Sequence, residues 1–277
     1  MGPEHSQGFI LDVDGTLIEG TRPAEGGRLL PGARELVDWL RHESIPFVCF
    51  TNGTGLTPRA YALAIREHGL EMSEEEWMTP ATVAAAYIGR RWPNQSVLAL
   101  GGPGLTEPLR DRGIQLLDSM SEWRLASVVC VGWDRALSYE RLESACRAVW
   151  NGAVFLVTSD APTFHLLGDR GIGLSAAIAA AITKVTKRRP ILLGKPSRLA
   201  LSAACDRLRR TPAEVTVVGD DIDVEVKMGV RFGCHTVFVE SGLSGKIDWS
   251  KTRDSGRPDL IVPNLLGLVD RLREPMA

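Results

Sequence analysis

The sequence has little of what marks several large classes of protein. It holds only five cysteines, an odd number with no Cys-x-x-Cys pair, so neither a disulfide framework nor a thiolate zinc site fits. No apolar run reaches the roughly 18 residues that a membrane-spanning helix needs. The first residues also lack the basic-then-apolar pattern of a signal peptide. We therefore expect a cytoplasmic protein with reduced, packed cysteines and no membrane partner.

The chain also lacks an excess of charge of either sign. Its 32 basic and 34 acidic residues leave a net charge of −2, so no overall positive field exists to hold a nucleic acid. We expect no nucleic-acid partner. The hydrophobic content of 44% and the charged content of 24% are typical of a globular chain. At roughly 150 residues per domain, 277 residues predict nearly two domains.

Short apolar runs alternate with helical patterns along the chain, which predicts an α/β fold with a parallel sheet and crossover helices. The strand-like runs in the first and last parts of the chain cover residues 9–12, 46–50, 214–219 and 234–239. The middle part repeats the pattern between two polar, proline-containing stretches at 78–80 and 187–190. This organisation predicts a discontinuous core domain, residues 1–79 and 187–277, around an inserted domain, residues 80–186.

Polar residues end three of these strand-like runs: Asp12 and Asp14, Thr51 and Asn52, and Asp220. In an open parallel sheet, ligands bind outside the carboxyl ends of the strands, so these groups should gather at one edge. Gathered carboxylates raise one another's pKa, and a bound divalent cation removes that cost. Ligands that are all oxygen, without histidine or cysteine, favour Mg²⁺.

The segment Asp12-Val-Asp-Gly-Thr16 is the most informative of the three. Side chains two residues apart in an extended chain point to the same side, so both carboxylates can face one reactant. One can then attack while the other exchanges a proton with the leaving group. Two acids before a glycine also occur as plain turn caps, and these five residues alone leave that alternative open.

The full set of motifs is more specific. Asp-x-Asp-Gly-Thr, then Thr51-Asn, then Gly194-Lys-Pro and finally Gly219-Asp-Asp resemble, in this order, the four motifs of the haloacid dehalogenase (HAD) superfamily. Pro-Gly-Ala at 31–33 and Asn-Gly-Ala at 151–153 resemble its NagD and 4-nitrophenylphosphatase branch, subfamily IIA. The resemblance spans nearly the whole chain. It implies a Rossmann-like core with an inserted α/β cap domain of the C2 type.

The resemblance assigns roles to the acids. Asp12 would be the nucleophile that forms an aspartyl-phosphate, and Asp14 the general acid and then the base for water. The Asp12 and Asp220 carboxylates, with the backbone carbonyl of Asp14, would bind Mg²⁺. Dehalogenases of this superfamily lack an acid at the position of Asp14, because a halide leaves without a proton. Asp14 therefore favours phosphoryl transfer over dehalogenation.

The remaining motif residues would bind the phosphoryl group. Thr51 would donate a hydrogen bond to a phosphoryl oxygen, with Asn52 and the backbone of Gly53 beside it. Lys195 would neutralise phosphoryl charge and hold Asp12. Phosphoryl transfer depends mainly on positioning and charge stabilisation, and this set of groups supplies both.

Three residues depart from the usual pattern of the branch. Gly53 stands where a second asparagine is usual, which removes one polar contact. Val224 and Glu225 stand where threonine and aspartate are usual, so we expect weaker metal binding or a lower rate than is common in the family. Asp221 and Asp223 are open to two interpretations, as outer groups of the metal site or as solvent-facing loop acids.

The expected function is Mg²⁺-dependent hydrolysis of a small phosphate monoester through a phosphoaspartate. Two alternatives stay open: a phosphotransferase or mutase with the same fold, and a catalytically weak protein that binds a phosphate ligand. The resemblance further suggests that the cap segment at 168–173 faces the substrate, and a plain loop at the entry of a helix is the alternative. Caps of this branch often form homodimer contacts, but the residues leave the oligomeric state open. The residues do not identify the substrate.

Overall fold

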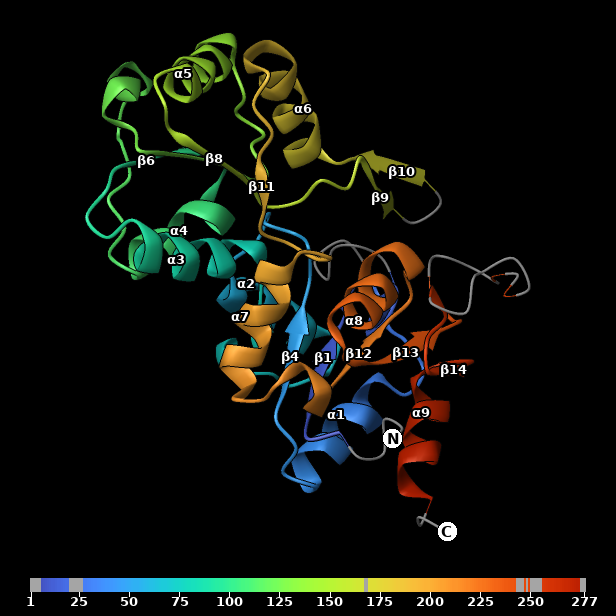
Figure 1. The fold of residues 1–277 in the computed structure, drawn as a ribbon. Helices are drawn as coiled ribbons and strands as arrows, with labels where there is room; N and C mark the ends of the chain where they lie inside the picture. The colour runs from blue at the N-terminus through green and yellow to red at the C-terminus, as the bar shows by residue number, and fades with distance from the viewer. Residues whose placement is uncertain are drawn as a thin grey trace.

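The structure is a computed structural model, and it describes residues 6–19, 27–166, 169–242, 247, 249 and 256–274. Within these residues the chain forms two separate parallel sheets, each covered by helices on both faces. Figure 1 shows the larger sheet in the lower half of the molecule and the smaller one in the upper half. All five cysteines are buried and none forms a disulfide. No helix in the described part of the chain has the length and apolarity to cross a bilayer.

The larger sheet has the strand order β14-β13-β12-β1-β4-β5, and all neighbouring strands are parallel. Its strands are β1 (Gly8–Leu11), β4 (Phe47–Phe50), β5 (Trp77–Met78), β12 (Val215–Gly219), β13 (His235–Val239) and β14 (Leu260–Val262). Strand β1 lies between β4, which follows it in the chain, and β12, which comes back after the insert. The order therefore reverses at β1, and such a switch point is where open α/β sheets bind ligands.

Alternation along the strands distributes the core between the two faces of this sheet. Phe9 and Leu11 pack with Leu36 on one face, while Ile10 packs with Leu201 on the other. The first face is covered by α1 (Ala33–His42), α2 (Pro58–Glu67) and α9 (Leu265–Arg273), and the second by α7 (Arg198–Leu208) and α8 (Lys227–Phe232).

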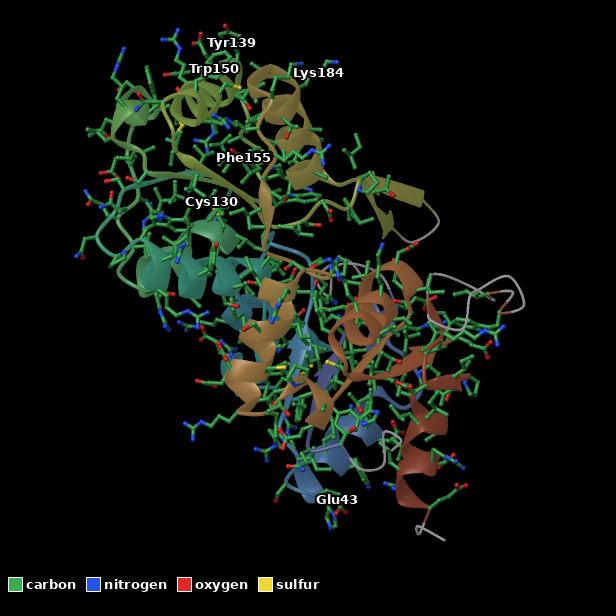
Figure 2. All side chains as sticks on the ribbon, in the orientation of Figure 1. Glu43, Cys130, Tyr139, Trp150, Phe155 and Lys184 are labelled. Atoms are coloured by element: carbon green, nitrogen blue, oxygen red, sulfur yellow. The ribbon has the colours of Figure 1, made fainter. Side chains whose placement is uncertain are left out.

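The smaller sheet is the inserted unit, with the parallel order β11-β8-β7-β6. Its strands are β6 (Val97–Leu100), β7 (Val128–Val131), β8 (Val154–Val157) and β11 (Ile191–Leu192). Helices α3 (Pro80–Arg91) and α4 (Pro103–Asp111) cover one face, and α5 (Tyr139–Trp150) and α6 (Leu174–Thr186) the other. Figure 2 shows Cys130 and Phe155 within these layers, while Tyr139 and Trp150 lie on the outer side.

Short elements complete the described chain. Two antiparallel pairs are β2 (Ile18–Glu19) with β3 (Arg28–Leu29) and β9 (Thr163–Leu166) with β10 (Asp169–Ile172). The 3-10 helices are η3 (Glu74–Glu76), η4 (Met120–Leu125) and η5 (Pro212–Glu214), and η6 (Ile222–Val226) is a π-helix.

The predicted α/β class, with a parallel core sheet and a separate inserted sheet, is confirmed. Helix α3 begins at Pro80, the first residue of the predicted insert. Residues 191–192 still pair with β8, so the smaller sheet extends beyond residue 187. A two-residue strand directly after Pro190 has no periodicity that a sequence pattern can reveal. The domain boundaries stay a prediction.

The close packing of α9 against the start of α1 can be tested by substitution. Gly32, which precedes α1, has φ of 89°, and a Cβ there would lie 1.9 Å from the backbone nitrogen of Leu266. We expect Gly32→Ala to lower the free energy of unfolding by about 2–5 kcal/mol, through left-handed strain plus overpacking.

Gly113 provides the matched control for this substitution, with φ of 73° and no atom within 4 Å of its Cβ position. Gly113→Ala should cost only the backbone strain, about 1–2 kcal/mol. Urea unfolding of both variants measures the difference. Equal losses would contradict the packing of α9 against Gly32.

Candidate active site

Three neighbouring strands of the larger sheet deliver the predicted polar residues to one edge. Asp12 follows β1, Thr51 follows β4 and Asp220 follows β12. The register pairs Leu11 with both Val218 and Cys49, so the three strands end at about the same level. The gathering of groups that are far apart in the sequence is thus produced by the parallel topology.

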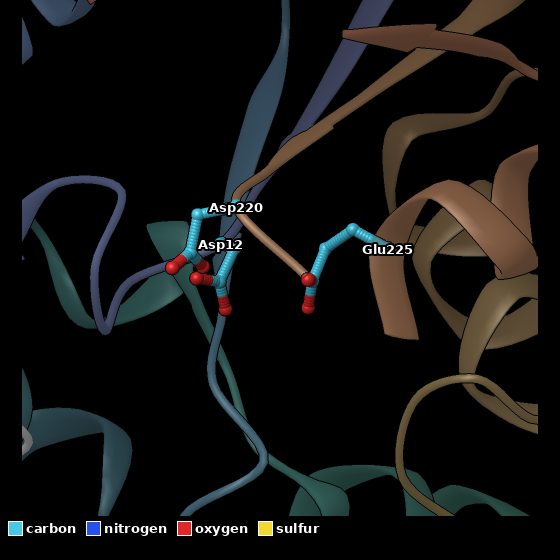
Figure 3. A group of neighbouring side chains, drawn as sticks. All are labelled: Asp12, Asp220 and Glu225. Carbon is cyan, nitrogen blue, oxygen red and sulfur yellow. The ribbon is translucent and has the colours of Figure 1, made fainter. Parts of the chain in front are cut away.

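A buried cluster of carboxylates lies at this edge, as Figure 3 shows. One oxygen from each of Asp12, Asp220 and Glu225 lies within 4.8 Å of the others, and all three residues are buried. The second Glu225 oxygen, Oε2, is covered and has no hydrogen-bond partner among the described residues. Such an orphaned oxygen beside two other carboxylates fits a divalent cation with oxygen ligands. The side chain of Asp14 does not belong to this cluster.

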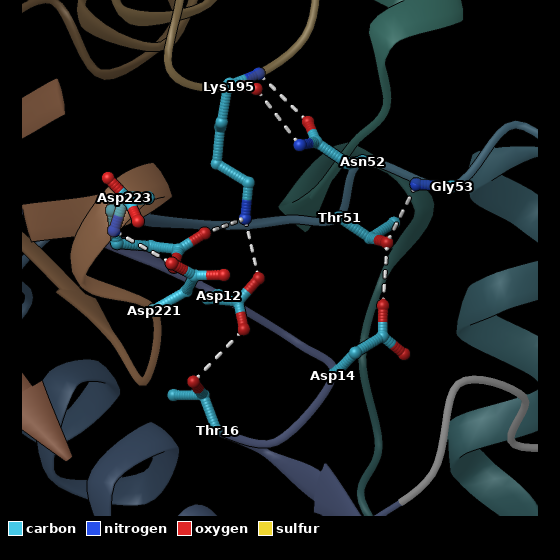
Figure 4. Close-up of polar contacts among 10 residues, drawn as sticks. Asp12, Asp14, Thr16, Thr51, Asn52, Gly53, Lys195, Asp221 and Asp223 are labelled. Carbon is cyan, nitrogen blue, oxygen red and sulfur yellow. Dashed lines mark hydrogen bonds and ion pairs between the residues drawn. The ribbon is translucent and has the colours of Figure 1, made fainter. Parts of the chain in front are cut away.

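Lys195 is the cation that holds the cluster together (Figure 4). Its Nζ lies 2.5 Å from Asp12 Oδ1 and 2.8 Å from Glu225 Oε1, and its side chain is only 1% exposed. Burial alone would lower the pKa of Lys195, but the carboxylates of Asp12 and Glu225 raise it above its ordinary value. Lys195 therefore stays charged. The predicted contact between Lys195 and Asp12 is present in the structure.

Both oxygens of Asp12 are held by the protein. Oδ1 accepts the hydrogen bond from Lys195, and Oδ2 accepts one from Thr16 Oγ1 at 3.0 Å. Thr16 comes from the same Asp-x-Asp-Gly-Thr segment, after the turn at Gly15, whose φ is 90°. The carboxylate of Asp12 is consequently fixed in one orientation towards the cavity.

Glu225 reaches the cluster because of two local features. It lies in the π-helix η6, which begins directly after the strand-end acids. It also folds across Gly219, where a Cβ would lie 2.2 Å from Glu225 Cγ. Burial, opposed by the charge of Lys195, raises the pKa of Glu225 well above its ordinary value. The longer side chain, expected to weaken the metal site, is thus accommodated by a glycine.

Asp14 stands apart from the cluster with a different partner. Its Oδ2 accepts a hydrogen bond from Thr51 Oγ1 at 3.0 Å, and Thr51 Oγ1 in turn accepts one from the Gly53 N–H at 3.0 Å. Its Oδ1 is covered and has no hydrogen-bond partner in the described part of the chain. Burial, and then the nearby Asp12 carboxylate, raise the pKa of Asp14 to about 8. A carboxyl group that keeps its proton at neutral pH suits a general acid.

Asn52 links two of the motifs. Its side-chain nitrogen donates to the Lys195 carbonyl at 3.0 Å, and its Oδ1 accepts from the Lys195 N–H at 2.8 Å. Gly194 keeps this contact close, because a Cβ there would lie 2.7 Å from Asn52 Oδ1. The amide of Asn52 therefore holds the backbone that carries Lys195. Its predicted contact with substrate stays a prediction.

A cavity of about 580 Å³ lies above these groups, between the core and the cap. The core supplies its floor, including Asp12, Asp14 and Lys195. Trp133 and Phe164, in edge-to-face contact with ring centroids 5.2 Å apart, belong to the roof. The lining residues from the cap are Gly102, Pro103, Trp133, Arg135, Ser159, Ala161, Thr163, Phe164, Gly173, Leu174 and Ser175.

The predicted cap segment contributes to this roof at one end. Gly173 lines the cavity, whereas Gly168 and the side chains of Asp169 and Arg170 lie outside the described residues. Asp221 lines the cavity, whereas Asp223 does not. Asp221 accepts from the Asp223 N–H at 2.7 Å and caps η6, while the exposed Asp223 lies 3.6 Å from the Lys227 ammonium.

Sequence reasoning missed some residues of this site. Thr16 and Glu225 carry a usable signal, because Thr16 completes the first motif and Glu225 stands where the family pattern has an acid. Tyr61, Trp133 and Phe164 carry none, because their place in the cavity depends on how helix α2 and the cap pack.

Comparison with known proteins agrees with this geometry. The family model "Haloacid dehalogenase-like hydrolase" matches residues 9–115, and a HAD-hydrolase-like model matches residues 192–268. An acid sugar phosphatase of Staphylococcus epidermidis is 31% identical over 242 residues, which is 87% of this chain and 89% of that protein.

Solved structures give the same result. A p-nitrophenyl phosphatase from Archaeoglobus fulgidus superposes with a TM-score of 0.85 at 28% identity, covering 96% of this chain and 99% of its own. NagD from Escherichia coli superposes with a TM-score of 0.83 at 25% identity, covering 96% and 98%. The predicted family and branch are confirmed.

The buried lysine gives a prediction about stability. Lys195→Met leaves the carboxylates of Asp12 and Glu225 buried without their cation, so we expect the free energy of unfolding to fall by about 3–5 kcal/mol. Urea unfolding in the presence of a chelator measures this loss without any contribution from metal.

Arg147→Met is the control, because Arg147 makes an exposed pair with Glu143 one helical turn away. Its removal should cost no more than about 1 kcal/mol. An equal free energy of unfolding for Lys195→Met and the wild type would contradict the buried charge contacts of Lys195 with Asp12 and Glu225.

Proposed function

The chain belongs to the haloacid dehalogenase-like hydrolases, in the branch of NagD and the 4-nitrophenylphosphatases, and we propose that it hydrolyses small phosphate monoesters with Mg²⁺ through a phosphoaspartate. The carrying observation is that two carboxylates two residues apart face one capped cavity with different partners. Asp12 is held by Lys195 and Thr16, and Asp14 by Thr51. Such a division suits a nucleophile beside a proton donor.

In the first step an Asp12 oxygen attacks phosphorus and the ester P–O bond breaks. Lys195 and Thr16 keep the Asp12 carboxylate in one orientation, which reduces the entropy lost on reaching the transition state. Asp14 transfers its proton to the departing alcohol oxygen. Lys195 also places a fixed positive charge where negative charge accumulates on the phosphoryl oxygens.

In the second step water attacks the phosphorus of the aspartyl-phosphate. Asp14, now a carboxylate, takes the proton of that water, and the Asp12–phosphate bond breaks. Phosphate leaves and Asp12 returns to its starting state. The same side chain thus serves as acid and then as base, and Thr51 holds it in place for both steps.

Asp12, Asp220 and Glu225 would hold the Mg²⁺, together with the backbone carbonyl of Asp14. When bound, the cation would offset the repulsion between the incoming phosphate and the carboxylates. The fit is supported by the three converging oxygens and by the orphaned Oε2 of Glu225. Asp14 contributes to this site only through its backbone in our proposal.

The cap roof would bind the leaving group. A cavity of about 580 Å³ admits a small ester rather than a polymer end. The related acid sugar phosphatase and p-nitrophenyl phosphatase support sugar phosphates and aryl phosphates as the first esters to try. The cytoplasmic location and the homodimer contact through the cap stay predictions.

The proposal is tested with 4-nitrophenyl phosphate, with and without Mg²⁺, on the wild type and Asp12→Asn. We expect turnover that needs Mg²⁺ and that Asp12→Asn abolishes, because the amide cannot form the phosphoaspartate. Asp223→Asn serves as the control, since this exposed acid lies outside the cavity lining. Turnover that survives Asp12→Asn would contradict the assignment of Asp12 as the nucleophile.

The same assay separates the alternatives. A phosphotransferase would pass the phosphoryl group to added alcohol, so released phosphate would fall while released nitrophenol would not. A protein that only binds a phosphate ligand would release neither product. We expect phosphate and nitrophenol in equal amounts.

Asp14 gives a prediction about the leaving group. Nitrophenolate departs without a proton, whereas the alkoxide of a sugar needs one. The parameter kcat/KM covers the steps up to departure of the alcohol, so Asp14→Asn should lower it about 10²–10⁴-fold for a sugar phosphate and clearly less for 4-nitrophenyl phosphate. Equal losses for both esters would contradict the role of Asp14 as general acid.

A further inference from the structure

The backbone conformation of residue 53 does not require a glycine, so the reason for Gly53 lies in its surroundings. Its φ is not in the left-handed region, so other residues could adopt the same backbone conformation. A Cβ at this position would nevertheless lie 2.4 Å from the hydroxyl oxygen of Tyr61. The space beside residue 53 is therefore taken by the phenol of Tyr61, which comes from helix α2.

The ring of Tyr61 is fixed in place. It stacks on the indole of Trp77, with centroids 5.2 Å apart and an interplanar angle of 11°, and it is buried. Trp77 is itself fully buried in β5, where it pairs with Cys49 of β4. A ring held in this way directs its hydroxyl at the turn that follows β4, the turn that carries Thr51.

The hydroxyl lies close to the turn that holds Asp14. The same Cβ position at residue 53 is 3.3 Å from Thr51 Oγ1, so both hydroxyls border one small space. Thr51 accepts the hydrogen bond from Gly53 and donates to Asp14. Tyr61 also lines the cavity wall beside these groups. A shift of the 51–53 turn would therefore move the hydroxyl on which the Asp14 carboxyl depends.

We propose that Tyr61 is a positioning residue for the general acid Asp14. Its hydroxyl fills the place of the side chain that the related branch has at residue 53. It thereby holds Thr51, and through Thr51 it holds Asp14 in line with the leaving group. This inference rests on the proposed phosphatase function. It extends that function, because the positioning of the proton donor Asp14 then depends on two residues, Tyr61 and Gly53, that share one small space.

The first experiment removes only the hydroxyl. Tyr61→Phe keeps the stack on Trp77, and kcat/KM is measured for a sugar phosphate and for 4-nitrophenyl phosphate. We expect a loss of about tenfold or more for the sugar phosphate, a fraction of the 10²–10⁴-fold that a general acid contributes, and little loss for the aryl ester. Tyr87→Phe, in an aromatic pair with Trp92 away from the cavity, should change neither value.

The second experiment displaces the hydroxyl while keeping it. Gly53→Ala puts a methyl group 2.4 Å from the phenol oxygen, so it should reproduce the leaving-group-dependent loss. Gly89→Ala is the matched control, because its Cβ would make only an ordinary contact of 3.7 Å with Arg112 in the cap. The double variant Tyr61→Phe/Gly53→Ala should be no worse than either single variant, since both act on one interaction.

The third experiment is a rescue. In the Tyr61→Phe background the space beside residue 53 is free of the hydroxyl, so Gly53→Asn should restore most of the activity on the sugar phosphate. In the wild-type background the same substitution should be harmful, because the amide and the phenol compete for one site. A purely structural role of Tyr61 predicts no such reversal, and thermal unfolding of every variant checks that the fold is retained.

Some outcomes overturn the inference. Equal losses for the two esters, additive losses in the double variant, or no loss in Tyr61→Phe would each reject the positioning role while leaving the phosphatase intact. A wild-type protein that hydrolyses none of the esters would instead reject the proposed function, and the role of Tyr61 with it.

Discussion

The structure depends on one buried ammonium group, that of Lys195, between the carboxylates of Asp12 and Glu225. Each of these charges would be costly to bury alone, and together they are tolerable only at close contact. The three residues come from three segments: the end of β1, the loop after the insert, and the π-helix η6. The chain must therefore come back from the cap to the edge of the core sheet. Asn52 holds the returning segment there through two hydrogen bonds with the backbone of Lys195.

In the proposed mechanism this triad also explains how two acids in one short segment acquire different tasks. Asp12 shares the cation and stays aligned, whereas Asp14 receives only the hydroxyl of Thr51 and keeps one oxygen without a partner among the described residues. Burial acts on Asp14 without a cation in contact to offset it, so its pKa rises. Pairs of acids whose surroundings differ in this way are a recurring basis for dividing nucleophile from proton donor.

The sequence predicts much of the core because the relevant physics is local or topological. Apolar runs that end in acids mark β1 and β12, and parallel pairing brings Asp12 and Asp220 together without further information. The family pattern points to an acid at Glu225, but the way its longer side chain reaches the cluster could not be predicted, because it depends on a π-helix and on the empty side-chain position at Gly219. The roof residues are equally hidden, since the contact between Trp133 and Phe164 depends on how segments of the cap pack against each other, and their place above the site depends on how the cap packs on the core.

Two departures from the family pattern, Glu225 and Gly53, have a common physical form. At Gly219 and at Gly53, a missing Cβ leaves room for a longer side chain from another segment, Glu225 in one case and Tyr61 in the other. In both cases the incoming group is polar, is buried, and ends beside a carboxylate or the hydroxyl that serves one. The glycine and its incoming neighbour therefore form one unit, and neither can be judged alone. In our proposal the motif at residues 51–53 keeps its chemistry without the expected side chain, because the phenol of Tyr61 fills the vacated volume, so the space beside a motif matters as much as its sequence.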